Sequence, residues 1–174
     1  LKMRLTQLND PQNYTALKNE IKIVDIIYDQ VRSLSKDLDI KNKFNNKLEE
    51  ILEYLVEEMC SSFQNVELYI FPKEKLNSIE DQEFINAISL TAKELITNII
   101  KHAKAQSITL DLTAHKDSII LIISDDGIGF NNNKYGLGLK NINDRAVLYE
   151  GEMTIDSSTK KGTSVTVKFL FNFD

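Results

Sequence analysis

The sequence predicts an α/β protein in which helices cover one face of a mixed, mostly antiparallel sheet. Two observations carry this prediction. Segments of helical and strand periodicity follow one another in the order helix, strand, helix, strand, strand, loop, helix, strand, strand, and amphipathic helices of this kind need a sheet to pack on. The strand at 107–113 alternates apolar and polar side chains, so one of its faces is open. The predicted architecture is a two-layer α/β sandwich preceded by a partial helical hairpin.

The first part of the chain predicts that hairpin. Leucines recur at helical spacing in residues 1–8, and Asn9-Asp10-Pro11 ends the helix, because proline and turn formers interrupt it. A returning helix keeps a seven-residue apolar rhythm at Leu17, Ile21, Val24, Tyr28, Val31 and Leu38. A hairpin of this size lacks a core of its own, so we expect it to pair with a second copy. The polar stretch 39–46 is the predicted linker, which divides the chain into 1–38 and 39–174.

The second part contains the predicted sandwich. An amphipathic helix carries apolar residues from Phe44 to Met59, and further helices are predicted at 81–103 and 139–149. The predicted strands are 66–71, 107–113, 118–124, 152–156 and 164–171. The strand at 118–124 is almost continuously apolar, so we expect a central strand that is buried on both faces. A polar, glycine-bearing loop follows it at 125–138.

Composition excludes some classes of function. The net charge of −5 argues against a broad nucleic-acid-binding surface. Cys60 is the single cysteine, so the chain forms no internal disulfide, and we expect a packed core thiol in a reducing compartment. No stretch is apolar for long enough to cross a bilayer. We therefore expect a cytoplasmic portion, with any membrane anchor in segments upstream of Leu1.

The first chemically notable segment is Glu94-Leu-Ile-Thr-Asn98-Ile-Ile-Lys101-His102. Helical spacing places Glu94, Asn98 and Lys101 on one stripe beside the apolar face. Asn98 can offer an oxygen to magnesium, Lys101 can neutralise phosphate, and Glu94 can orient a metal-bound water or accept a proton. A solvated helix face remains the alternative interpretation.

The second segment is Asp125-Asp126-Gly127-Ile128-Gly129, directly after the apolar strand. A carboxylate that leaves the core at Asp125 is partly desolvated and needs a donor such as an exocyclic amine. Gly127 and Gly129 would let the backbone approach a flat ring closely. An ordinary strand-to-loop turn is the alternative.

The third segment is Gly136-Leu137-Gly138-Leu139, at the start of a predicted helix. Glycines in this position expose backbone N–H groups to an anion at the positive end of the helix. The segment matches neither the Walker nor the dinucleotide pattern, and a flexible loop with a helix cap is the alternative.

Taken together, the three segments resemble the Bergerat-type ATPase superfamily, which includes gyrase, the heat-shock chaperone, mismatch-repair ATPases, anti-sigma-factor kinases and sensor histidine kinases. Gly162-Thr163 is similar to the Gly-Thr pair that closes the nucleotide site there. The amino-acid sequences of segments 94–103 and 136–146 resemble the corresponding segments of the histidine kinases related to nitrate and membrane-fluidity sensors. Residues 1–8 and 31–38 resemble parts of the dimerisation hairpin of that group, which places the phosphoacceptor histidine upstream of Leu1.

The resemblance implies a role for each candidate residue. Asp125 would accept a hydrogen bond from the adenine amine, helped by Thr163 directly or through water, while Gly127 and Gly129 give the base room. Asn98 would coordinate magnesium, Lys101 and His102 would touch phosphate, and Glu94 would assist through metal-bound water. The backbone amides of Gly136, Leu137, Gly138 and Leu139 would form a lid near the phosphates. Asp126 stands where asparagine is common, and His115 is expected to be a solvated turn residue.

The implied activity is that of the ATP-binding catalytic domain of a sensor histidine kinase. Such a domain delivers the γ-phosphate of Mg-ATP to a histidine on the hairpin, from which it passes to the receiver domain of a response regulator. The resemblance also implies a homodimer held by the hairpin. We expect this chain to bind Mg-ATP without phosphorylating itself. The alternatives are an anti-sigma-factor-type serine kinase and a non-catalytic nucleotide-binding scaffold.

Overall fold

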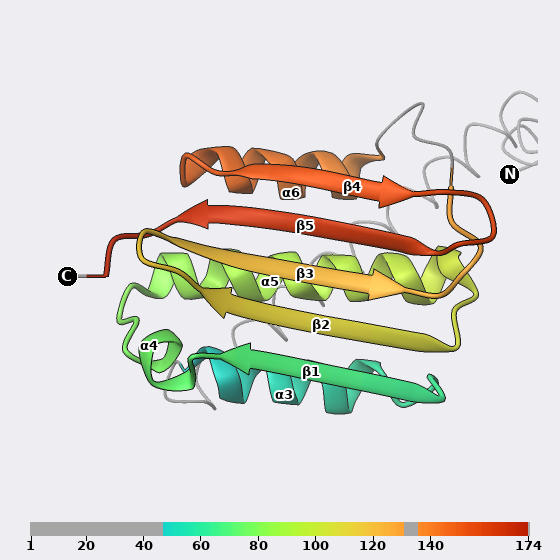
Figure 1. Ribbon diagram of the computed structural model, residues 1–174, viewed down its shortest axis with the longest axis horizontal. Helices are drawn as coiled ribbons and strands as arrows, with labels where there is room; N and C mark the ends of the chain where they lie inside the picture. Colours follow the sequence, from blue (N-terminus) through green and yellow to red (C-terminus); the bar gives the residue numbers. More distant parts are fainter. Residues whose placement is uncertain (1–46, 131–135, 174) are drawn as a thin grey trace, which may run out of the picture. The chain divides into compact units, whose positions relative to one another are not determined.

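The computed structural model describes residues 47–130 and 136–173 (Figure 1). The predicted hairpin and linker, together with Phe44, lie outside the described residues, so the division at residue 38 stays a prediction. Within the described residues the order of helices and strands matches the sequence-based expectation, apart from one additional short helix after the first strand.

The core of the described part is a five-stranded sheet in the order β1-β2-β3-β5-β4. The strands are β1 (Asn65–Phe71), β2 (Ser107–Ala114), β3 (Ser118–Asp125), β4 (Glu152–Ser157) and β5 (Thr163–Leu170). β1 and β2 are parallel, whereas the other neighbours are antiparallel. This topology confirms the predicted mixed, mostly antiparallel sheet.

Helices cover one face of this sheet (Figure 1). They are α3 (Leu48–Met59), α5 (Gln82–Asn98) and α6 (Leu137–Leu148), with a short α4 (Lys73–Asn77) that the sequence pattern did not predict. The inward side chains of α5 and the strands form the hydrophobic core, with Phe84, Ile88 and Leu121 fully buried. α6 begins two residues earlier than predicted, because its first turn includes Leu137 and Gly138.

The prediction that β3 is buried on both faces is wrong. The strand is central in the sheet, but it alternates between Leu121 and Ile123, which are buried under the helices, and Ile120 and Ile122, which are half-buried. No described helix packs on the face that carries Ile120 and Ile122. Their cover comes instead from cross-strand neighbours on β2 and β5.

The helix predicted at 81–103 changes its geometry near its end. Asp81 caps its start by accepting hydrogen bonds from the N–H groups of Glu83 and Phe84. From Ile99 to Ala103 the chain continues as a π-helix, η1, which ends at Lys104 in the left-handed conformation with φ 53°. The apolar face predicted for this helix is buried as expected.

Two smaller predictions, on Cys60 and His115, can be compared with the fold. Cys60 is buried, which confirms a packed core thiol, and burial raises the pKa of that thiol to about 11. His115 is exposed in the turn between β2 and β3, as expected. Among the described residues, no helix has the length and apolar character that a membrane span requires.

Candidate functional site

A cavity of about 350 Å³ opens at the end of the sheet where β3 ends and β5 begins. One wall is the end of α5 with η1, and the start of α6 closes another side. The lining residues are Leu95, Asn98, Ile99, His102, Ala103, Ile123, Asp125, Gly129, Phe130, Gly136, Gly138, Leu139, Thr163 and Val165. The wall is mostly apolar with a few polar groups, the usual character of a small-molecule site.

Asp125 supplies the carboxylate of this cavity. It is the last residue of β3, lies opposite Thr163 of β5, and is half-buried. Burial raises the pKa of the Asp125 carboxyl, and the negative charge of Asp126 adds to this effect. The N–H of Gly127, which donates to Asp125 Oδ1 at 2.8 Å, and the amide of Thr163 act in the opposite direction. Asp125 is thus a partly desolvated acceptor next to an apolar wall.

Asp126 has a different role. Its Oδ1 accepts hydrogen bonds from the backbone N–H of Gln106 at 2.8 Å and of Ser107 at 2.9 Å. Both hydrogen bonds lower the pKa of the Asp126 carboxyl, and the bond from the Ser107 N–H has the larger effect. The side chain is exposed and does not line the cavity. Asp126 therefore fixes the loop against the start of β2, and its charge reaches the site as an electrostatic influence on Asp125.

The glycines of this loop permit close backbone packing. A Cβ on Gly127 would lie 2.3 Å from the carbonyl oxygen of Ala103, and the same carbonyl accepts a hydrogen bond from the Ile128 N–H at 2.8 Å. Gly129 has φ 62° and lines the cavity. Gly127 therefore holds the loop against η1 and is not a lining residue, whereas Gly129 faces the cavity directly.

Gly138 brings α6 against the polar face of α5. A Cβ at Gly138 would lie 2.1 Å from Glu94 Oε1 and 3.6 Å from Asn98 Nδ2, so the first turn of α6 touches both side chains. Asn98 lines the cavity, while Glu94 and the exposed Leu137 are not among the lining residues. The N-terminus of α6 is thus placed beside the Glu94–Asn98 pair.

The π-helix decides which of two neighbouring basic residues faces the cavity. In an α-helix both i+3 and i+4 lie near residue i. The wider turn of a π-helix, with its i→i+5 hydrogen bonds, keeps i+4 near residue i and turns i+3 away. Accordingly His102 lines the cavity with Asn98 and Lys101 does not, although both basic side chains are exposed. The single stripe of Glu94, Asn98 and Lys101 expected from α-helical spacing is therefore interrupted at Lys101.

Sequence reasoning missed the apolar wall of the cavity. These residues are Leu95, Ile99, Ala103, Ile123, Phe130 and Val165. Two of these residues could have been predicted from the sequence, because residues two positions apart on a strand lie on the same face of the sheet. Ile123 precedes Asp125 by two positions and Val165 follows Thr163 by two, so both belong on the side of the predicted polar groups.

The polar side chains at the cavity suit a metal ion that binds together with a small-molecule ligand. Among residues 47–130 and 136–173 no group of three or more His, Cys, Asp or Glu side chains is placed to hold a metal ion. Asn98 and Glu94 alone would leave most positions around a magnesium ion open. Magnesium often keeps several waters and takes its remaining ligands from substrate phosphates. The donor set thus suits a magnesium ion carried by a polyphosphate.

The sheet, its helical layer and the carboxylate-ended cavity define the class of protein: a two-layer α/β-sandwich domain with a small-molecule cavity at one end of its sheet. Residues 85–172 match the model of the histidine kinase-, DNA gyrase B- and HSP90-like ATPase family. The chain belongs to this family.

The curated relatives are sensor histidine kinases. The signal transduction histidine-protein kinase/phosphatase DegS of Bacillus subtilis is 36% identical over 104 residues, which are 53% of this chain and 27% of that protein. The oxygen sensor histidine kinase NreB of Staphylococcus carnosus is 33% identical over 92 residues, 51% of this chain and 26% of the relative. The chain therefore spans about a quarter of the length of these relatives.

Solved structures agree on the fold. The histidine kinase domain of the blue-light activated kinase from Erythrobacter litoralis EL346 superposes with a TM-score of 0.60 at 16% identity, covering 88% of this chain and 86% of that one. The ATP-binding domain of PrrB from Mycobacterium tuberculosis gives a TM-score of 0.56 at 17% identity, covering 71% and 93% respectively. Both comparisons support the predicted sandwich of the Bergerat type.

Proposed function

We propose that the described domain binds Mg-ATP and delivers its γ-phosphate to a histidine, as the catalytic domain of a two-component sensor kinase. The observation that carries this proposal is the placement of Asp125 at the end of an interior strand, facing an apolar cavity of about 350 Å³. Its desolvated carboxylate is suited to accept a hydrogen bond from an exocyclic amine, which adenine provides.

The apolar wall would hold the purine ring. Ile123 and Val165 flank the polar pair Asp125 and Thr163 on the strands, and Leu95 and Ile99 face them from the helix. A flat ring whose amine is bound to Asp125 would then lie between the sheet and the helix. Gly129 also lines the cavity and would border this ring.

The phosphates would lie toward the start of α6. His102 and the backbone amides of 136–139 are the donors on that side, and the positive end of the helix favours an anion. Asn98 would be the magnesium ligand, and Glu94, next to it, would orient a metal-bound water. Magnesium would neutralise charge on the transferred phosphoryl group, and the protein groups would fix its position. Lys101 would act on the phosphates only at longer range.

The partners of the whole protein follow from the same proposal. The relatives named above are sensor kinases, so we infer that the phosphoryl group passes from a histidine to the receiver domain of a response regulator. We also infer a homodimer through the helical segment at 1–38, as the apolar rhythm there predicts.

Calorimetric titration with ATP and magnesium tests this function. We expect the wild-type chain to bind, and Asp125→Asn to weaken binding about tenfold or more, the size of one charge-assisted hydrogen bond. Asp126→Asn is the matched control, because it removes the same charge one residue further on without touching the cavity, and it should largely preserve affinity. Equal affinities for wild type and Asp125→Asn would contradict the adenine site.

A further inference from the structure

Ser157 lies in the same cross-strand row as the two polar residues of the base site. β3 pairs Asp125 with Thr163, and β4 pairs Ser157 with that same threonine. Within this row, Thr163 lines the cavity and Ser157 does not. Ser157 can therefore affect a ligand only through its neighbours.

The hydroxyl of Ser157 joins three groups of the site's rim. Its Oγ accepts a hydrogen bond from the Phe130 N–H at 3.0 Å. It also lies 3.3 Å from the carbonyl oxygen of Gly162 and 2.9 Å from Thr163 Oγ1. The shortest of these contacts is the one to the threonine hydroxyl, and its length is typical of a good O–H···O bond.

The available protons restrict how these groups can be paired. A serine hydroxyl carries one proton, which it can donate either to the Gly162 carbonyl or to Thr163. If Ser157 donates to Gly162, Thr163 must donate to Ser157, and only its lone pairs remain for the cavity. If Ser157 donates to Thr163, the proton of Thr163 is free to point at a ligand. The position of one serine proton thus sets the threonine as acceptor or donor.

Adenine needs the second arrangement. Its edge presents an amine next to an unprotonated ring nitrogen, whereas guanine and hypoxanthine present a carbonyl next to a ring N–H. An acceptor at Asp125 beside a donor at Thr163 matches adenine and mismatches the other two. We propose that Ser157 is the positioning residue that holds Thr163 as a donor, and that it thereby sets the preference for adenine over 6-oxopurines. This inference rests on the proposed nucleotide function and adds a specificity determinant to it.

The test compares the affinities for ATP and for inosine triphosphate, which differ at this edge of the base. Ser157→Ala should weaken ATP binding about three- to tenfold, the range of one neutral hydrogen bond, and should not weaken inosine triphosphate binding, because the released Thr163 hydroxyl can also accept. The ATP preference then falls by at least the same factor. Ser157→Thr, which keeps the hydroxyl, should restore most of that preference.

Ser164→Ala is the matched control. Ser164 shares a hydroxyl–hydroxyl bond of 2.8 Å with Ser124 on the adjacent rung, outside the cavity-lining residues. Its loss should leave both affinities unchanged. If Ser157→Ala and Ser164→Ala shift the two nucleotides alike, Ser157 is only structural and the inference is wrong.

The Thr163→Val variant keeps the inference testable even if Ser157→Ala folds poorly, and it gives a double-mutant cycle where both variants fold. Thr163→Val alone should reduce the ATP preference by at least as much as Ser157→Ala, and adding Ser157→Ala to it should cause no further loss. A full preference in Thr163→Val overturns the inference. Wild-type chain that binds neither nucleotide, or Asp125→Asn that binds ATP normally, would instead count against the proposed function itself.

Discussion

At the scale of single residues, two adjacent aspartates have opposite environments. Asp125 is half-buried, and the loss of solvent raises its carboxyl pKa. Asp126 is exposed, and the amides of Ser107 and Gln106 lower its carboxyl pKa. The two side chains therefore make contributions of opposite sign to the pH dependence of folding.

We expect Asp125→Asn to increase the stability of the nucleotide-free domain near neutral pH. Because the folded pKa of Asp125 is raised, its stabilising contribution is complete below the unfolded pKa and is lost as pH rises through the folded value. At neutral pH the charged side chain is therefore a net cost, which asparagine removes. Urea unfolding at several values between about pH 3 and 7 measures this, and the gain should vanish at the acidic end.

Asp126→Asn provides the comparison with the opposite sign. The folded pKa of Asp126 is lowered, so its contribution is present above the unfolded pKa and is lost as pH falls through the folded value. The variant should be less stable than wild type at neutral pH and equal to it in acid. A loss of stability in Asp125→Asn that matches the loss in Asp126→Asn would show that the cavity does not desolvate Asp125.

At the scale of secondary structure elements, periodicity predicted most of the sandwich. Alternation identified β2, and the helical repeat identified α3, α5 and α6, since both patterns follow from which face is buried. The short α4 was not predicted, because five residues are too few to repeat a pattern. The prediction missed that one face of β3 is only partly covered. The isoleucines on that face are covered by side chains of neighbouring strands, and a run of apolar residues in the sequence looks the same whether neighbouring strands or a second layer of helices covers them.

Site residues were predictable where a motif fixes both residue type and position. Asp125, Thr163 and Asn98 line the cavity as expected from their segments. Lys101 does not line the cavity, and the side-chain pattern of η1 gives no sign of the change from α- to π-geometry; its contact with phosphate stays a prediction.

The π-helix leads to a prediction about the two basic residues that it separates. His102→Ala should weaken ATP binding about tenfold, because a hydrogen bond to a charged phosphate is lost. Lys101→Ala should weaken it less than about threefold, since Lys101 is not among the cavity-lining residues and its charge would act through solvent. Titrations at low and high salt measure both, and salt should further reduce the Lys101 effect. A larger loss in Lys101→Ala would mean that the lysine reaches the phosphates.

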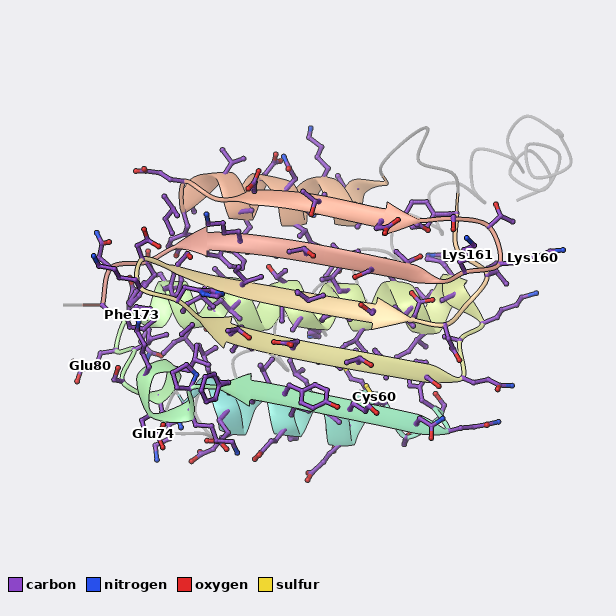
Figure 2. The ribbon with its side chains drawn as sticks, viewed as in Figure 1. Cys60, Glu74, Glu80, Lys160, Lys161 and Phe173 are labelled. Atoms are coloured by element: carbon purple, nitrogen blue, oxygen red, sulfur yellow. The ribbon has the colours of Figure 1, made fainter. Side chains whose placement is uncertain are left out.

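At the scale of the whole described domain, the cavity and a cluster of aromatic side chains lie at opposite ends of the sheet. Phe84 is fully buried in that cluster, stacked on Phe171 at 4.4 Å and edge-on to Tyr149 at 4.9 Å. Phe173 extends the cluster, with Lys75 Nζ 4.0 Å from its ring centre. In Figure 2, Phe173 lies at the end opposite Lys160 and Lys161, which occupy the turn before β5. α5 connects the two ends, since it runs from Gln82 to Asn98.

This separation predicts that the aromatic cluster stabilises the fold without tuning the site. Asn98 follows Phe84 by 14 positions, a separation of about 21 Å along the helix, which is well beyond the distance at which substitutions usually couple. Phe84→Leu should lower the free energy of unfolding by about 1–3 kcal/mol through the loss of ring contacts in a closed core. ATP at a hundredfold excess over its dissociation constant should add about 2.7 kcal/mol to wild type and variant alike.

Urea unfolding of both proteins, with and without ATP and magnesium, checks this additivity. The two ATP increments should agree within about 0.5 kcal/mol, because a rigid helix that is packed along its whole length can lose a contact at one end without changing its register at the other. A smaller increment in Phe84→Leu would mean that α5 shifts as a unit when the cluster is weakened. Asn98 and His102 would then depend for their positions on packing at the far end of the sheet, and the nucleotide site would extend energetically through the whole domain.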